Sequence, residues 1–340
     1  SPTITNDFAR DIDQHLRVKL SNVIGEPVSD DIWNQARLPV KSHGFGLGHV
    51  EDTISAAYVA NVMETQRAVL DKLPSATYLN HLNDPQEELD AIRLGSAQIE
   101  EFVDVFRTHN SKIKHAANTT GVDISGTFAT HLETRKLQFL FTKVFTTHRV
   151  CKFEQHIAAH GSPADKARIF SNDGSFAGAW LFSVPKNDKS IIAAETFRKC
   201  CRLRLGMAFN ELPTTCCCRG HKVIDRTNPC LSLLGLPEFK HLCTDRHNAI
   251  QAEIKALANS AGLRVDDRKL TVFRVTNDDD GKRPDLLIPT MGEDGRNLLV
   301  DITIGHPTCP SYVTQAARTR HYTLNELHRR KNVKYLQRCT

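Results

Sequence analysis

The sequence predicts an α+β protein with a mostly helical N-terminal region, a Cys/His-rich segment and a C-terminal α/β unit. Up to about residue 150, apolar residues recur at the three-to-four spacing of amphipathic helices. Five of the ten cysteines lie between Cys216 and Cys243. Beyond residue 246, short β-type runs are bounded by turn residues. We therefore assign residues 1–210 to the helical region, 211–245 to the Cys/His-rich segment and 246–340 to the α/β unit.

In the helical region, the spacing predicts helices over residues 52–70, 87–106, 131–158 and 191–209. The Gly-rich residues 38–48 lack the preceding strand and the following Lys-Ser/Thr of a phosphate-binding loop, so a structural loop is expected there. Residues 73–90 and 160–176 are also expected to be loops.

In the α/β unit, the sequence predicts a helix over residues 248–261, ended by Gly262. Three strands should follow, over residues 270–275, 286–288 and 297–304, the last of them fully buried because of its apolar density. Residues 312–337 should form the final helix.

The composition excludes several classes of protein. The 340 residues are 40% hydrophobic and 24% charged, with a net charge of +5, so disorder of the whole chain is excluded. No apolar run approaches the roughly 18 residues of a membrane span, and no membrane partner is expected. The first ten residues lack a secretory signal, and a chain that begins at Ser is expected to be a fragment or a processed product.

Two aspartates suggest a metal site in the α/β unit. Asp285 opens one β-run and Asp301 lies in the next, across a hairpin turn, so paired strands can bring both carboxylates together. A shared Mg²⁺ or Mn²⁺ would compensate two charges among Leu, Ile and Val, and would activate water against a phosphodiester. Lys331 or Lys334 would stabilise the developing negative charge. Alternatively, each Asp caps a turn and the lysines are solvated.

The Cys/His-rich segment suggests Zn²⁺, because thiolates and imidazoles suit tetrahedral zinc. The candidate ligands are Cys216, Cys218, His221 and Cys230, with Cys217, His241 and Cys243 as alternatives. The opposing interpretation is a degenerate site whose cysteines pack as small apolar residues.

Four motifs occur in order behind this segment: Arg246 to Asn248, Arg283 to Asp285, Val300 to Thr303 and Lys331 to Tyr335. This order resembles the C-terminal part of reverse transcriptases from site-specific non-LTR retrotransposons. Residues 38–47 and 51–57 also resemble the region behind the polymerase in those proteins.

The resemblance implies a zinc knuckle followed by a restriction-like endonuclease of the PD-(D/E)XK fold that nicks DNA. Arg246 and His247 would contact DNA or the zinc module. The implied active-site residues are Asp285, Asp301, Lys331, Lys334 and Tyr335.

Two departures from the family pattern matter. No Tyr-x-Asp-Asp polymerase motif is present, so this chain is not expected to polymerise DNA; it is either the C-terminal fragment of a larger protein or a descendant that lost the polymerase. Thr303 stands where a Lys is expected, so the catalytic cation would have to come from the later helix.

The leading hypothesis is a metal-dependent endonuclease module that binds DNA or RNA. Residues 301–340 carry seven basic and two acidic residues, an excess equal to that of the whole chain. Within this segment, the residues expected to face phosphates are Arg318, Arg320, Arg329 and Arg330. The alternative is a domesticated protein without catalysis, a nucleic-acid- or protein-binding component of a ribonucleoprotein assembly. The expected compartment is the nucleus, or the mitochondrion for a domesticated form.

Overall fold

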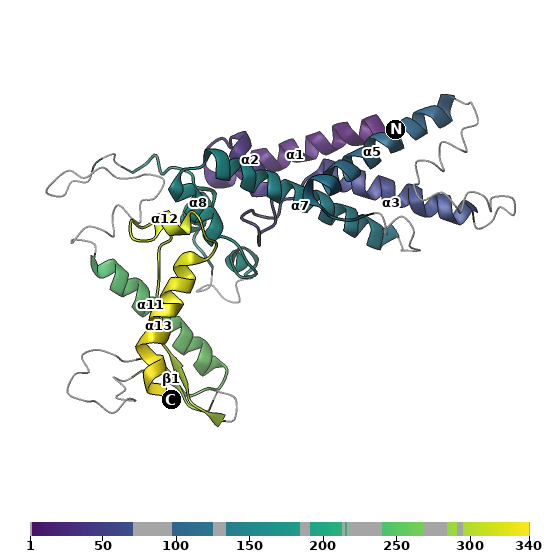
Figure 1. Ribbon diagram of the computed structural model, residues 1–340. Coiled ribbons are helices and arrows are strands. Elements are labelled where there is room, and N and C mark those ends of the chain that lie inside the picture. Colours follow the sequence, from purple (N-terminus) through teal and green to yellow (C-terminus); the bar gives the residue numbers. More distant parts are fainter. Residues whose placement is uncertain are drawn as a thin grey trace, which may run out of the picture. The chain divides into compact units, whose positions relative to one another are not determined.

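The computed structural model describes residues 2–70, 97–124, 134–183, 191–212, 215, 240–267, 284–290 and 295–339 (Figure 1). It is mostly helical, with one two-stranded sheet among these residues, and so belongs to a mixed α+β class. The chain forms two compact units. The first, called here the helical unit, contains Ser1–Gly161 and Gly174–Leu205, and the second, the C-terminal unit, contains Ser162–Asp173 and Gly206–Thr340.

The helical unit is built around three long helices. The elements of this unit are α1 (Pro2–Ile24), α2 (Asp30–Arg37), α3 (Val50–Leu70), α5 (Ala97–Thr120), α7 (Thr134–His160), the short 3₁₀ helix η2 (Ala179–Phe182) and α9 (Ala194–Leu205). Helices α3, α5 and α7 pack on one another, and α1 packs on α3 (Figure 1). Their apolar faces meet in one core, in which Phe106, Ile113, Leu137 and Phe141 are fully buried.

The Gly-rich residues 38–48 form a loop that is held from several sides. Gly46 and Gly48 adopt positive φ angles of 75° and 72°, which glycine tolerates at no steric cost. The buried guanidinium of Arg204 donates to the carbonyl oxygens of Val40 at 2.5 Å, Ala177 at 2.7 Å and Gly44 at 3.1 Å. The loop is therefore fixed to α9 and to the residues before η2.

The C-terminal unit combines helices with a small antiparallel sheet. Its elements are α8 (Pro163–Ser171), α11 (Lys240–Ser260), β1 (Leu286–Ile288), β2 (Leu298–Val300), α12 (Val313–Ala316) and α13 (Tyr322–Cys339). β1 pairs with β2 so that Leu286 lies opposite Val300. Helix α12 packs on α8.

The strand 286–288 and the end of the predicted helix 248–261 at Gly262, whose φ is 77°, are confirmed. That helix, α11, begins at Lys240, eight residues earlier than predicted. Residues 160–176 were wrongly expected to be a loop, because Ser162 and Asp165 form a capping box that starts α8 at Pro163. The predicted strand 297–304 was also wrong in its length and burial: β2 ends at Val300, and Leu298 is 38% exposed.

The helix expected over 312–337 is interrupted. α12 ends at Ala316, and α13 begins only at Tyr322, after His321 with a φ of 56°. A positive φ cannot continue a right-handed helix, so the chain turns between the two. The predicted strand 270–275 and the predicted loop 73–90 lie outside the described residues.

Candidate functional site

The candidate site lies in the C-terminal unit, at one end of the strand pair. Asp285 directly precedes β1 and Asp301 directly follows β2. Because Leu286 and Val300 are partners, these aspartates are one step further along the same register. Opposite residues of an antiparallel pair point to the same face, so the two carboxylates are neighbours.

Helix α11 holds Asp285. His247 Nε2 lies 3.2 Å from Asp285 Oδ2, and Gln251 Nε2 donates to the Asp285 carbonyl oxygen at 2.7 Å. His247 and Gln251 are four residues apart and so share one face of α11. The backbone N–H of Ile302 also donates to Asp285 Oδ2, at 2.5 Å. The carboxylate is therefore fixed by a helix and by the chain that follows Asp301.

Helix α13 holds Asp301 in a similar way. Lys331 Nζ forms an ion pair with Asp301 Oδ2, and the Tyr335 hydroxyl hydrogen-bonds to the same carboxylate. Lys331 and Tyr335 are one helical turn apart. Burial, the charge of Asp301 and that of Asp285 raise the pKa of Tyr335, so this phenol stays protonated and acts as a donor.

The two carboxylates are shielded but accessible. The side chains of Asp285 and Asp301 are 20% and 14% exposed, so a small ligand can still reach them from solvent. In the described part of the chain, every hydrogen bond to the Asp285 carboxylate reaches Oδ2. Its Oδ1 is thus available to a ligand.

The donor set suits a hard divalent cation. Two carboxylates are what Mg²⁺ commonly takes from a protein, with water and phosphate completing its shell. Among the described residues, no group of three or more His, Cys, Asp and Glu side chains is arranged to hold a metal. A cation here would therefore rely on ligands from solvent or substrate.

The sequence-predicted catalytic residues are partly brought together. Asp285, Asp301, Lys331 and Tyr335 meet at the strand ends. Lys334 lies in α13, but its side chain is outside the described residues. Two polar contacts were missed by the sequence reasoning: Gln251 and the Ile302 N–H. For Gln251 a signal existed, because it lies four residues after His247.

The predicted nucleic-acid contacts have varied surroundings. His247 contacts Asp285, and Arg246 is half-buried with its Nε unpaired among the described residues. That either residue also contacts DNA stays a prediction. Burial and the nearby charge of Arg246 lower the pKa of His306, which lies in the segment after Asp301.

The arginines around α13 differ in their partners. Arg320 pairs with Asp173 at 2.5 Å and lies over the Phe170 ring, so it ties the start of α13 to the α8 segment. Arg318 is exposed, and Arg329 and Arg330 both pair with Glu326 at 2.8 Å. Their contact with nucleic acid stays a prediction.

The predicted zinc ligands Cys216, Cys218, His221 and Cys230 lie outside the described residues. Of the alternatives, His241 is exposed and Cys243 is a half-buried free thiol at the start of α11. Zinc binding therefore stays a prediction. No helix in the described ranges is long and apolar enough to span a membrane.

Comparisons with protein-family models, with curated protein sequences and with solved structures found no match for this chain.

Proposed function

We propose that the C-terminal unit is a metal-dependent endonuclease that hydrolyses DNA phosphodiesters, in a chain that binds nucleic acid. The observation that carries this proposal is the pair of neighbouring carboxylates, Asp285 and Asp301, at the end of β1 and β2. A lysine and a tyrosine reach the pair from α13. Neighbouring carboxylates that can hold a metal ion, with a lysine close by, are typical of sites for metal-assisted phosphoryl chemistry.

Asp285 and Asp301 would hold Mg²⁺ or Mn²⁺, because both carboxylates are hard oxygen donors that remain partly exposed. The cation would supply Lewis-acid polarisation of the scissile phosphate. His247 and Gln251 would position Asp285 by holding both its carboxylate and its backbone carbonyl. These contacts fix the donor before substrate arrives, so little reorganisation is needed.

Lys331 and Tyr335 would act on the substrate side. Lys331 is 27% exposed, so its ammonium can turn from Asp301 towards a phosphate and stabilise the negative charge that develops there. Tyr335 cannot act as a base near neutral pH, because its pKa is raised. It would donate a hydrogen bond and keep Asp301 oriented.

The test is cleavage of a supercoiled plasmid by the purified chain with Mg²⁺ or Mn²⁺. We expect Asp285→Asn and Asp301→Asn each to lower the rate by about 100-fold or more, because each removes a negative charge that would hold the cation. Asn has nearly the same volume as Asp, so the fold should not be disturbed. Asp267→Asn is the matched control, since Asp267 is also paired with a lysine, Lys255, at an exposed place in the same unit. Cleavage that survives the double substitution at Asp285 and Asp301 would contradict the mechanism.

A second candidate is a non-catalytic, nucleic-acid-binding component of a ribonucleoprotein assembly. It is favoured by the ion pair between Lys331 and Asp301, which compensates this carboxylate without any metal. Such a protein would bind DNA or RNA with a steep dependence on salt and would show no cleavage with either cation. The plasmid assay on the unmodified chain separates the two candidates.

A further inference from the structure

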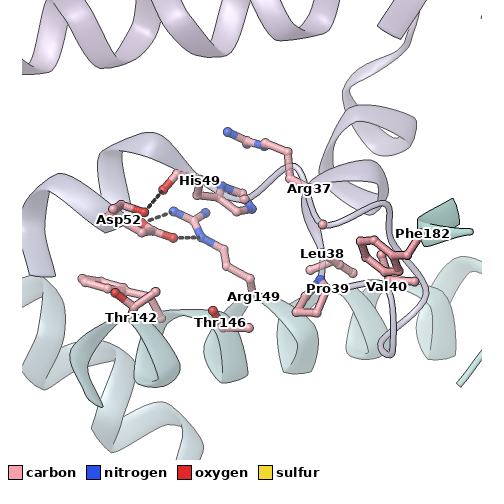
Figure 2. A pocket seen from close by; sticks show the side chains of 14 residues that line it. Arg37, Leu38, Pro39, Val40, His49, Asp52, Thr142, Thr146, Arg149 and Phe182 are labelled. Atoms are coloured by element: carbon pink, nitrogen blue, oxygen red, sulfur yellow. Dashed lines mark hydrogen bonds and ion pairs between the residues drawn. The ribbon is translucent and has the colours of Figure 1, made fainter. Parts of the chain in front are cut away.

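The helical unit contains a pocket of about 300 Å³, far along the chain from the two aspartates. It lies between the loop 38–48, the start of α3 and the middle of α7 (Figure 2). Its volume is at the lower end of the range of small-molecule sites, roughly 300–1,000 Å³. A ligand about the size of a nucleoside would fill it.

Both arginines that line the pocket are paired with a carboxylate. Arg149 donates from Nε and Nη2 to the two oxygens of Asp52, both at 2.9 Å (Figure 2). Arg37 pairs with Asp13 at 2.7 Å. Each guanidinium therefore already has a carboxylate partner, Asp52 in the lining or Asp13 behind it, and would have to give it up to bind a bare phosphate. We therefore expect the part of the ligand that lies inside the pocket to be uncharged.

The pocket nevertheless has polar groups without partners. Within the described residues, the hydroxyls of Thr142 and Thr146 make no hydrogen bond, whereas Thr147, on another side of α7, donates to the Lys143 carbonyl at 2.9 Å. His49 Nε2 is buried and also unpaired there. Burial lowers the pKa of His49 to about 3, so its ring is neutral and has one donor and one acceptor nitrogen.

The remaining wall is apolar. Leu38, Pro39 and Val40 from the loop and Phe182 from η2 lie at one end of the pocket (Figure 2). Phe182 is 69% exposed although it belongs to a folded element. An aromatic ring left open beside a pocket is a surface on which a flat ligand can stack.

We propose that this pocket binds one nucleobase, either of a free nucleoside or of an unpaired nucleotide in a strand. A base has flat apolar faces for Phe182 and the loop, and edges that both donate and accept hydrogen bonds for Thr142, Thr146 and His49. A base is also uncharged, so it can bind without taking an arginine away from its carboxylate partner. The inference concerns the helical unit and does not depend on the nuclease proposal.

The experiment is isothermal titration calorimetry of the full chain with each of the four ribonucleosides, with a short unpaired oligonucleotide and with inorganic phosphate. We expect at least one nucleoside or the oligonucleotide to bind, and phosphate alone not to bind. Binding of free nucleosides identifies a small-molecule site, and binding of the oligonucleotide alone identifies a site for a strand.

Two matched pairs of variants tie the binding to the pocket. Thr142→Val combined with Thr146→Val should weaken binding by about fivefold or more, whereas Thr147→Val should leave it unchanged. Phe182→Ala should weaken it by a similar factor through lost stacking, whereas Phe139→Ala, at a ring that is 68% exposed outside the pocket, should not. Because Phe182 is exposed, its removal leaves the fold intact.

Three outcomes would overturn the proposal. The first is that neither a nucleoside nor the oligonucleotide binds. The second is that neither the double substitution Thr142→Val and Thr146→Val nor Phe182→Ala weakens binding. The third is that inorganic phosphate binds as tightly as the nucleosides. The nuclease proposal can fail without affecting these results, since plasmid cleavage and titration report on different units.

Discussion

The two units of the chain use their polar side chains differently. In the helical unit, Arg204 is only 4% exposed, and its guanidinium donates to three backbone carbonyls. In the C-terminal unit, polar side chains from two helices converge on Asp285 and Asp301, which solvent still reaches. The first arrangement closes a loop and stabilises a fold. The second keeps two paired carboxylates partly exposed to solvent.

This contrast predicts that stability resides mainly in the core of the helical unit. Phe106 is fully buried among α3, α5 and α7, and Phe106→Ala should lower the free energy of unfolding by about 3–5 kcal/mol through lost burial and a cavity. Urea unfolding followed by circular dichroism measures it. Phe139→Ala, at an exposed ring of α7, should change it by less than about 0.5 kcal/mol. Equal effects of the two substitutions would contradict the assignment of the core.

A smaller effect is expected where α13 packs against the chain after Asp301. A Cβ at Gly305 would clash with Leu327 Cδ1 and would lie 2.8 Å from Thr323 Cγ2. Gly305→Ala should therefore destabilise the C-terminal unit by about 1–3 kcal/mol through overpacking. It should also move Lys331 relative to Asp301 and slow plasmid cleavage. Unchanged unfolding and unchanged cleavage would show that α13 does not pack closely at this glycine.

The pH dependence should also distinguish the units. The pKa of His49 is lowered to about 3, chiefly by burial and also by Arg37 and Arg149, whereas its unfolded value is 6.5. As the pH falls below 6.5, the unfolded chain takes up a proton that the folded chain does not, so stability is lost towards pH 3. The slope for one such histidine is at most about 1.4 kcal/mol per pH unit.

Urea unfolding at several pH values checks this expectation. His49→Gln removes the titration but keeps a polar side chain, so its stability should fall less steeply with acid. Some slope should remain, because burial also lowers the pKa values of His109 and His148 in the same unit. The same slope in the variant and the natural chain would show that His49 is not buried as described.

Substitution in the candidate site itself should have only a small effect on stability. Asp301→Asn removes the ion pair with Lys331, but Lys331 is 27% exposed and can be solvated instead. The free energy of unfolding should therefore change by no more than about 1 kcal/mol. If cleavage is lost while urea unfolding is nearly unchanged, Asp301 has a role in catalysis and not in stability. A loss of several kcal/mol would instead make it a structural residue.

Local sequence signals predicted the elements that depend on them. The end of α11 at Gly262 follows from the tolerance of glycine for positive φ, and the strand at 286–288 follows from its apolar run. The loop predicted over residues 160–176 overlooked the start of α8, although Ser162, Pro163 and Asp165 together are a strong helix-start signal.

Most features that depend on tertiary contacts could not be predicted. The apolar run after Asn297 favours a long strand, yet β2 ends at Val300, and the N–H of Ile302, two residues later, donates to the Asp285 carboxylate. The pairing of the two aspartates was predicted from their position on either side of a turn. The role of α11 was not: the four-residue spacing places His247 and Gln251 on one helix face, but nothing local shows that this face meets Asp285.

The position of α8 in the chain has a consequence for how the protein is synthesised. Residues 162–173 belong to the C-terminal unit, although the chain returns to the helical unit for residues 174–205 before the rest of the C-terminal unit begins. During synthesis, α8 therefore leaves the ribosome well before α12, the helix on which it packs. A polypeptide that starts at Gly206 would lack α8 and could not form the Arg320–Asp173 ion pair. The C-terminal unit is thus a discontinuous domain, which a single cut in the gene cannot isolate.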